Sequence, residues 1–260
     1  MANHSQDDRP LCPYCGSTQI SKNGSTHHKK QKYLCKECRR QFIENPQKKY
    51  IQSSTKLLIK KLLLEKISLV GIARSLRQLL PGVQLRASLA LQVSMTWLQK
   101  FVNDFYRRIP CQTEAKLESQ IDLIIECDEL WSFVKSKENA VYIWLAINRK
   151  SRQIVGVHFG NRSRDSAQEF WDSLPQEYRE RALVYTDLWL SYQEVIPPWQ
   201  HQPSSKKSGE TNHIERFNNT LRQRCSRLVR KTLSFSKNFF NHEGAIWYFV
   251  HHYNEELLTS

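Results

Sequence analysis

Two aspartates follow short apolar segments, where carboxylates could hold divalent cations. Asp128 follows residues 121–127 (IDLIIEC), and Asp187 follows residues 183–186 (LVYT). Both segments are rich in β-branched and aromatic residues, which favours strands. Open α/β sheets place their chemistry at the carboxyl ends of strands. We therefore expect both carboxylates to lie at the functional edge of a sheet.

A third acidic candidate, Glu215, lies in the helix-like segment TNHIERFNNTLRQR and shares one face with Asn219 and Arg222 at i, i+4, i+7 spacing. Three carboxylates from two strands and a helix would hold two divalent ions about 3.5–4 Å apart. Such a pair activates a water or a 3′-hydroxyl and stabilises the attacking and leaving oxygens of a phosphodiester displacement. Oxygen ligands suit Mg²⁺ or Mn²⁺. The carboxylates would act as ligands, not as nucleophiles.

Each acid also has a simpler interpretation. Glu126 competes with the first aspartate because it points to the same face two residues earlier, and Glu129 would point to the opposite face if the strand continued. Asp187 could cap a helix that follows its strand. Asn212 and Glu215 are spaced as in a capping box, in which the glutamate accepts a backbone N–H. Spacing alone leaves these alternatives open.

Four cysteines form a second candidate metal site. Cys12 and Cys15 make one C-x2-C pair, nineteen residues follow, and Cys35 and Cys38 make another. Four thiolates fill the tetrahedral shell of Zn²⁺ and leave no position for water, so we expect one structural zinc ion. Gly16 can take the left-handed turn after the first pair. The alternative is four unpaired or redox-active cysteines.

The composition points to a polyanionic partner. The 260 residues include 39 Lys and Arg against 25 Asp and Glu, a formal charge of +14, with a pI near 9.5. Double-stranded DNA is the favoured partner, and an anionic membrane surface is the alternative. We find no apolar run near the ~18 residues of a spanning helix and no signal-peptide core, so we expect a cytoplasmic, nucleoid-associated protein without a membrane segment.

The basic residues concentrate in three places, and a solvated surface is the simpler interpretation of such runs. Interleaved aromatic residues favour phosphate contacts near the cysteines. The DNA-contact candidates are Lys29, Lys30, Arg39 and Arg40 near the cysteines, Thr96 and Lys100 in a helical region, and Arg222, Arg224, Arg230 and Lys231 toward the end.

The helical region spans residues 53–106, where apolar and basic residues alternate with a period near 3.6. Residues 67–76 and 92–101 resemble the two helices of a helix-turn-helix, with Ser94 as the cap of the recognition helix. Residues 77–91, with a Pro-Gly breaker, separate them where three or four residues are usual. A plain helical bundle that links two domains is the alternative.

The remaining segments predict an α/β core. Strands are expected at residues 121–127, 141–147, 154–159 and 183–186, and helices at 165–174 and from 212 onward. The expected organisation is a zinc-ribbon-like module (1–50), a helical DNA-binding module (51–110), a linker (111–120) and a catalytic domain (121–260).

Four motifs in the second half resemble the catalytic half of the transposases of the insertion sequence one family, and the cysteine and helical segments resemble its DNA-binding half. The motifs are CDELWSFV at 127–134, TDLW at 186–189, HIERFN at 213–218 and RKTLSFSK at 230–237. The resemblance implies an RNase H-like fold, with a mixed sheet flanked by helices, and makes Asp128, Asp187 and Glu215 its DDE residues. The insert after Leu76 departs from the family pattern.

The resemblance also implies a DNA transposase. Such an enzyme recognises the terminal inverted repeats of a mobile element, cleaves the 3′ ends with divalent metal ions and transfers the strands to target DNA, in a homo-oligomeric complex. One alternative is a non-catalytic zinc-containing DNA-binding regulator derived from a transposase. Another is an RNase H-like nuclease that acts on a different nucleic acid.

Overall fold

A computed structural model describes residues 10–27, 29–44, 51–78, 93–113, 123–228 and 235–259. The chain divides into two compact units, Met1–Tyr50 and Ile51–Ser260, each described by itself below. Arg230, Lys231, most of the 77–91 insert and most of the expected linker lie outside the described residues.

The first unit is a small antiparallel sheet of β1 (Ile20–Ser25), β2 (Gln31–Cys35) and β3 (Gln41–Ile43), in the order β1-β2-β3. Its core is very small, with Tyr33 stacked on Phe42 at 5.7 Å between ring centroids. So little buried apolar surface supplies little folding free energy, which leaves a stabilising role for a metal ion.

The second unit begins with α1 (Ser53–Leu62), α2 (Leu69–Gln78) and α3 (Met95–Tyr106). The predicted helical region is confirmed. Ser94 caps α3 as expected, because its hydroxyl accepts the backbone N–H of Trp97 at 3.2 Å.

A five-stranded mixed sheet follows, in the order β6-β5-β4-β7-β8. Strands β4 (Ile124–Phe133), β5 (Ala140–Asn148) and β6 (Ile154–Gly160) pair antiparallel, whereas β7 (Leu183–Thr186) and β8 (His201–Pro203) continue the sheet in parallel. The α/β prediction is confirmed, with strands at all four expected positions and one further short strand, β8.

Strand β4 is longer than the sequence predicted. The expectation that Asp128 follows the strand is wrong, because β4 pairs with β5 without interruption from Ile125 opposite Asn148 to Phe133 opposite Ala140. The charged pair Asp128 and Glu129 ends the apolar run but not the ladder. Hydrogen bonding to a neighbouring strand overrides local composition here.

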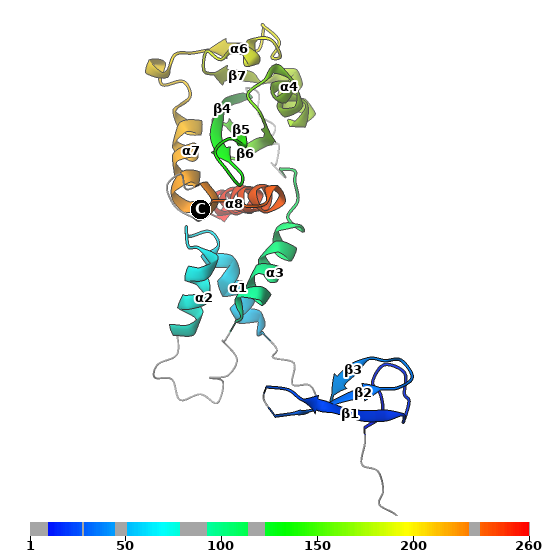
Figure 1. Cartoon of the computed structure of the whole chain (residues 1–260). Helices are drawn as coiled ribbons and strands as arrows, with labels where there is room; N and C mark the ends of the chain where they lie inside the picture. Colours follow the sequence, from blue (N-terminus) through cyan, green and yellow to red (C-terminus); the bar gives the residue numbers. More distant parts are fainter. Residues whose placement is uncertain are drawn as a thin grey trace, which may run out of the picture. The chain divides into compact units, whose positions relative to one another are not determined.

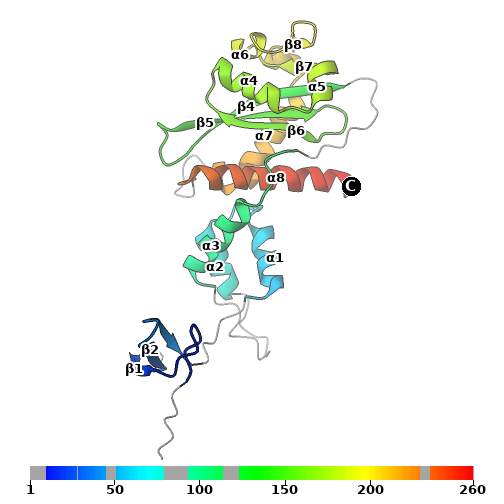
Figure 2. The same cartoon turned by 90° about the vertical axis from the view of Figure 1, so that its right-hand side faces the viewer.

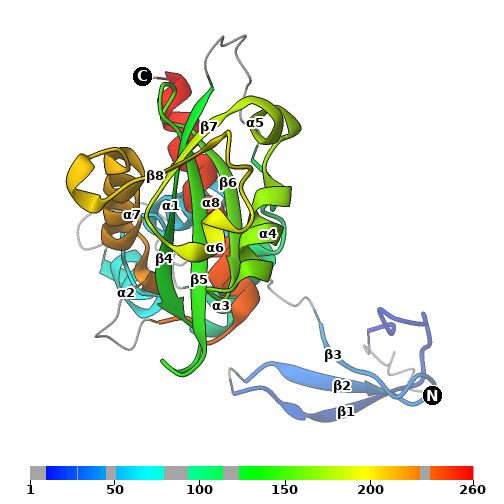
Figure 3. The ribbon, with the colours of Figure 1, turned by 90° about the horizontal axis from the view of Figure 1, so that it is seen from above.

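Helices cover both faces of this sheet (Figures 1 and 2). Helices α4 (Arg164–Ser173) and α5 (Gln176–Arg181) lie on one face, and α7 (Asn212–Arg224) and α8 (Phe239–Thr259) lie on the other. Figure 3 shows the strands between α4 and α7. The shorter elements are α6 (Leu190–Gln193), η1 (Lys206–Ser208) and η2 (Ser226–Leu228).

The three amino-terminal helices of this unit share a hydrophobic core with the sheet, α7 and α8. Helix α8 approaches α3 closely: a Cβ at Gly244 would lie 2.5 Å from Cβ of Tyr106. Asn241 donates a hydrogen bond from Nδ2 to Oδ1 of Asn103 at 2.9 Å. The functional division of this unit into DNA-binding and catalytic parts stays a prediction. In the described part of the chain, no helix is both long and apolar enough to cross a bilayer.

Candidate active site

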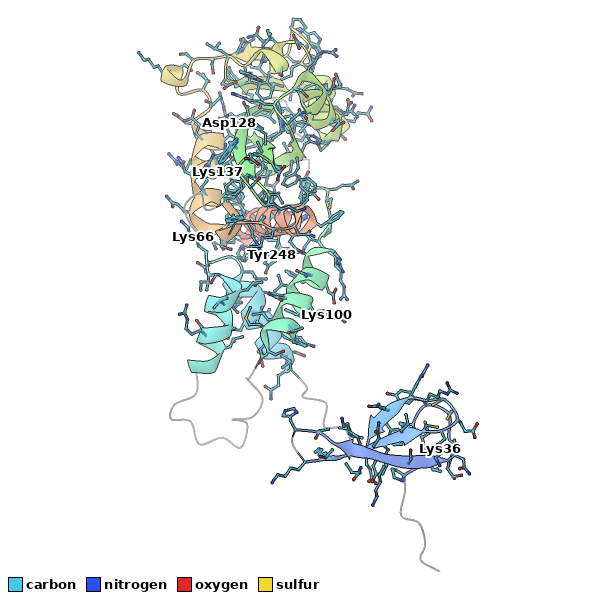
Figure 4. All side chains as sticks on the ribbon, viewed as in Figure 1. Lys36, Lys66, Lys100, Asp128, Lys137 and Tyr248 are labelled. Atoms are coloured by element: carbon cyan, nitrogen blue, oxygen red, sulfur yellow. The ribbon has the colours of Figure 1, made fainter. Side chains whose placement is uncertain are left out.

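A cavity of about 420 Å³ opens where β4, the end of β7 and α7 meet. All three acidic residues that the sequence singled out, Asp128, Asp187 and Glu215, line it. Figure 4 labels Asp128 on β4, beside α7. The other lining residues are Glu129, Leu130, Trp131, Tyr142, Arg162, Asn218, Asn219 and Arg222.

Strand register explains why the two aspartates are neighbours. The parallel pairing of β4 with β7 ends with Glu126 opposite Tyr185. Continued by two residues, this register places Asp187 beside Asp128, and adjacent strands lie about 4.8 Å apart. Beyond Tyr185, β7 no longer pairs with β4, although Thr186 still pairs with Pro203 of β8, so β4 has an open edge at Asp128. The carboxylates project into the space that β7 no longer fills.

Glu129 joins the two aspartates, although the sequence placed it on the opposite face. Oxygens of Asp128, Glu129 and Asp187 all lie within 4.8 Å of one another, and such a group could hold a metal ion. Glu215 lines the same cavity but lies outside this close group. The cavity therefore contains four carboxylates, three of them crowded together.

Burial and crowding disfavour the ionised forms of Asp128 and Glu129. Burial raises the pKa of Asp128 to about 7, the negative charge of Glu129 adds to this rise, and the hydrogen bond from Asn218 opposes it. Burial also raises the pKa of Glu129, as does the charge of Asp187, while Arg162 opposes the rise. A bound cation would offset this repulsion, since it favours the ionised carboxylates.

One oxygen of each predicted ligand already has a protein partner. Asp128 accepts a hydrogen bond at Oδ2 from Nδ2 of Asn218 at 2.8 Å. Asp187 accepts one at Oδ1 from the backbone N–H of Trp189 at 2.9 Å. The alternative that Asp187 caps a helix is wrong, because the N-cap of α6 is Trp189 and no side chain caps that helix. Glu215 accepts a hydrogen bond at Oε1 from Thr211 at 3.0 Å. These contacts orient the carboxylates in the cavity.

Glu126 stabilises a helix and does not line the cavity, so it does not replace Asp128 as a candidate metal ligand. It is 1% exposed, accepts a hydrogen bond at Oε1 from Nε of Arg149 at 2.8 Å, and accepts the backbone N–H groups of His213 and Ile214 at Oε2, at 2.8 and 3.2 Å. Those amides belong to the first turn of α7, where a negative charge is favourable. Glu126 thus fixes the helix that carries Glu215.

The capping box of Asn212 and Glu215 is absent among the hydrogen bonds of the described residues. Helix α7 starts at Asn212 after Thr211, and the carboxylate of Glu215 bonds the Thr211 side chain instead of a backbone amide. Glu126 satisfies the helix amides from a distant strand, which leaves Glu215 directed to the cavity. Sequence analysis could not identify this contact, because its partners are 87 and 88 residues apart.

Sequence analysis did not identify Asn218 or Arg162. Asn218 lies three residues after Glu215, which was the one available signal, since residues at i and i+3 share a helix face. It is 6% exposed, and its Oδ1 has no partner among the described residues. Arg162 follows β6 and carried no motif that marked it.

The four cysteines of the first unit come together as predicted. Their sulfur atoms all lie within 4.8 Å of one another, and the Cys12–Cys38 and Cys15–Cys35 separations are each 3.6 Å. Tetrahedral thiolates at Zn–S distances of 2.3 Å would lie about 3.8 Å apart. The cluster therefore fits a zinc module.

The turns around this cluster also fit a metal site. Gly16 and Arg39, which follow the second cysteine of each pair, have positive φ angles of 71° and 55°. The pKa of Cys35 is lowered to about 7, chiefly by the backbone N–H of Cys38. The pKa of Cys15 is instead raised to about 12, because the Ser17 backbone hydrogen bond, which lowers it, is outweighed by desolvation and the three neighbouring thiols. A lower thiol pKa favours the thiolate that a metal ion requires.

The DNA-contact candidates differ in their exposure and in their contacts. The basic side chains near the cysteines are exposed, as are Thr96 and Lys100 of α3. Arg222 lines the cavity. Arg224 pairs with Glu65 at 3.1 Å and with Glu256 at 3.7 Å, so it connects α7 to other parts of its unit. Their roles in DNA binding stay predictions.

Taken together, the second unit belongs to the α/β proteins with a carboxylate-lined cavity suited to hard divalent cations, and the first unit carries a four-cysteine site. The profile of the IS1 transposase family matches residues 122–254, just over half of the chain. The chain therefore belongs to the IS1 transposase family. This confirms the resemblance seen in the sequence.

Individual relatives agree with the family match. Insertion element iso-IS1n protein InsB of Shigella dysenteriae is 36% identical over 128 residues, covering 49% of this chain and 94% of that protein. Insertion element IS1 protein InsB of Shigella flexneri is 32% identical over 125 residues, 48% of this chain and 92% of that protein. Insertion element IS1 4 protein InsB of Escherichia coli (strain K12) is 29% identical over 156 residues, 59% and 90% respectively. Membership of this family supports a transposase function and implies chemistry on DNA.

Proposed function

We propose that this chain is a DDE transposase that binds the terminal inverted repeats of a mobile element, cleaves the 3′ ends and transfers them to target DNA. The observation that carries the proposal is the meeting of Asp128, Asp187 and Glu215 in one cavity. They come from a strand, the end of the neighbouring strand and a helix, and the mixed sheet that holds them is consistent with an RNase H-like core.

The chain's residues would divide the work as follows. Asp128 has an oxygen within 4.8 Å of one of Asp187 and lines the same cavity as Glu215, so it would be the shared ligand of two cations. Two Mg²⁺ or Mn²⁺ ions, when bound, would activate a water or a 3′-hydroxyl and stabilise the attacking and leaving oxygens. Asn218 orients Asp128, and Glu126 fixes the helix that carries Glu215.

Glu129 is a weaker ligand candidate than its place in the acidic cluster suggests. One of its oxygens accepts hydrogen bonds from the Arg162 guanidinium, and the other accepts one from the Tyr192 hydroxyl at 3.1 Å. A cation that bound Glu129 would have to displace the Arg162 guanidinium, which already pairs with that acid. We therefore assign the ligand role to the other three acids.

DNA recognition would use the basic surface of the zinc unit together with α3. The exposed Lys29, Lys30, Arg39 and Arg40 would contact phosphates, and Thr96 and Lys100 would contact DNA from α3. Structural zinc on the four cysteines would hold the first unit in shape. The active form would be a homo-oligomer that holds both element ends.

The test is the substitution Asp187→Asn in the full chain, compared with Asp172→Asn, an exposed aspartate on α4. Both variants should bind labelled element-end DNA as the wild type does. Only Asp187→Asn should lose cleavage in Mg²⁺ or Mn²⁺. Undiminished cleavage by Asp187→Asn would reject it as a ligand, and a wild type that binds the ends without ever cutting them would indicate a DNA-binding regulator instead.

A further inference from the structure

The cavity contains an arginine that the acidic triad does not explain. Arg162 lines it between β6 and α4, with 35% of its side chain exposed. Its guanidinium donates a hydrogen bond from Nε to Oε1 of Glu129 and forms an ion pair with the same oxygen through Nη2, which also lies 3.8 Å from Oδ2 of Asp187. The guanidinium carbon lies 3.7 Å from the ring centroid of Trp189. One side of the group is therefore held firmly by a buried acid and an aromatic ring.

The backbone that carries Arg162 is also fixed. Asn161 accepts hydrogen bonds at Oδ1 from the Ser163 N–H at 3.0 Å and from the Ser166 hydroxyl at 2.8 Å. The Asn161 carbonyl accepts the indole N–H of Trp144 at 3.0 Å, and a Cβ at Gly160 would lie 2.4 Å from the Ser166 hydroxyl. The guanidinium thus starts from a rigid turn, and little entropy is lost when it binds a ligand.

The Nη1 atom of the guanidinium is available for a further hydrogen bond, although the centroid of the Tyr142 ring lies 5.9 Å from the guanidinium carbon. Nη1 has no hydrogen-bond partner among the described residues, whereas a guanidinium has five N–H donors in a planar fork. Removing an ion pair from water costs several kcal/mol per ion, so such a pair is weak evidence for a role in stability. This one leaves N–H donors at a cavity that contains three further acids.

We propose that Arg162 is a phosphate-binding residue of the active site and that Glu129 and Trp189 serve to hold it. It would donate from its open side to a non-bridging oxygen of the DNA phosphate in the cavity. Arginine suits this task because its fork matches a phosphate and its charge is permanent. The inference rests on the proposed function, and it explains why a fourth, buried acid lies beside the triad.

The experiment compares four full-length variants. Glu129→Gln with Arg162→Gln replaces the ion pair by a neutral amide pair, which avoids an unpaired buried charge. Glu129→Gln alone tests the acid, Arg162→Lys keeps the charge but not the fork, and Arg164→Gln is a control at an exposed arginine two residues away. Each variant is measured for unfolding midpoint, Mn²⁺ affinity without DNA, and kcat and KM for cleavage of a duplex that carries the element end.

The double variant should remain folded and bind Mn²⁺ within about threefold of the wild type, but its cleavage should fall about 10²–10³-fold, the loss typical of one charge-stabilising donor. Arg162→Lys should be intermediate and Arg164→Gln unchanged. Wild-type cleavage by a folded double variant would overturn the inference, as would loss of Mn²⁺ binding in Glu129→Gln alone, since Glu129 would then be a ligand. A wild type that never cleaves the duplex would instead remove the proposed function, and this inference with it.

Discussion

The contact between Glu126 and the start of α7 predicts a large loss of stability on Glu126→Ala. The carboxylate receives two backbone N–H groups and one guanidinium N–H at 2.8, 3.2 and 2.8 Å, and it is 1% exposed. Hydrogen bonds to a charged group contribute about 1.5–3 kcal/mol each, and loss of one partner of a buried pair costs about 3–5 kcal/mol. Arg149 keeps a second partner, Glu210, at 3.0 Å, which limits the penalty.

We therefore expect the free energy of unfolding to fall by about 3–5 kcal/mol, a large share of the 5–15 kcal/mol typical of a domain. All seven tryptophans lie between residues 97 and 247, so their fluorescence in a urea titration reports only on the second unit. The midpoint should fall by about 1–2 M. Glu138→Ala, at an exposed glutamate between β4 and β5, should change the unfolding free energy by less than about 0.5 kcal/mol.

The milder change Glu126→Gln separates positioning from folding. The neutral amide keeps one acceptor oxygen, so it cannot satisfy both Arg149 and the helix amides. Helix α7 should then shift with Glu215, and Mn²⁺ affinity should fall about tenfold or more, as for other residues that orient metal ligands. An Ala variant as stable as the wild type, or a Gln variant with unchanged Mn²⁺ affinity, would refute this account.

Three further predictions test other parts of the chain. His242 is buried, forms hydrogen bonds with the hydroxyls of Ser132 and Ser236, and has its pKa lowered to about 4 by burial. It stays neutral in the folded protein but becomes charged near pH 6.5 in the unfolded chain. The free energy of unfolding should therefore be highest above pH 6.5 and fall by about 3 kcal/mol as the pH drops to 4. Urea titrations at several pH values should show this slope, and His242→Gln should lack it; an unchanged slope would contradict the burial argument. Asn218→Leu should weaken Mn²⁺ binding about 10–100-fold in calorimetry, because Asp128 loses the hydrogen bond that orients it. The unfolding midpoint should not fall, because the substitution also removes the buried Oδ1 atom that has no partner among the described residues. An unchanged Mn²⁺ affinity would exclude the orienting role. Cys35→Ser should reduce zinc content from one ion per chain to near zero and leave the tryptophan-monitored urea midpoint unchanged, whereas retained zinc would argue against the four-cysteine site.

Local sequence patterns were sufficient to predict those features of the site that depend on residues close together in the chain. The cysteine spacing predicted the cluster because each C-x2-C turn presents two sulfurs by itself. The helix cap at Ser94 was predictable because Trp97 N–H is three residues away. Asp187 was located because the strand LVYT ends beside it.

Other features of the site depend on contacts that no local pattern encodes. The sequence ended the strand before Asp128, but pairing with β5 carries β4 on to Phe133. Side chains alternate in direction along β4, so Asp128 and Glu129 would be expected on opposite faces. Both carboxylates nevertheless lie close to Asp187, because β7 stops pairing with β4 there and leaves the edge of β4 open.

The sequence alone determined which classes of metal ion this protein could bind: four thiolates suit a soft ion, and carboxylates on strands and a helix suit hard ones. Tertiary structure decided which acids do which task. Glu126 became a helix anchor because α7 docks against β4, Glu129 became the partner of an arginine from another turn, and Glu215 was left facing the cavity. The physical reason is that a carboxylate's role depends on which donors surround it, and those donors are brought by segments up to 90 residues away.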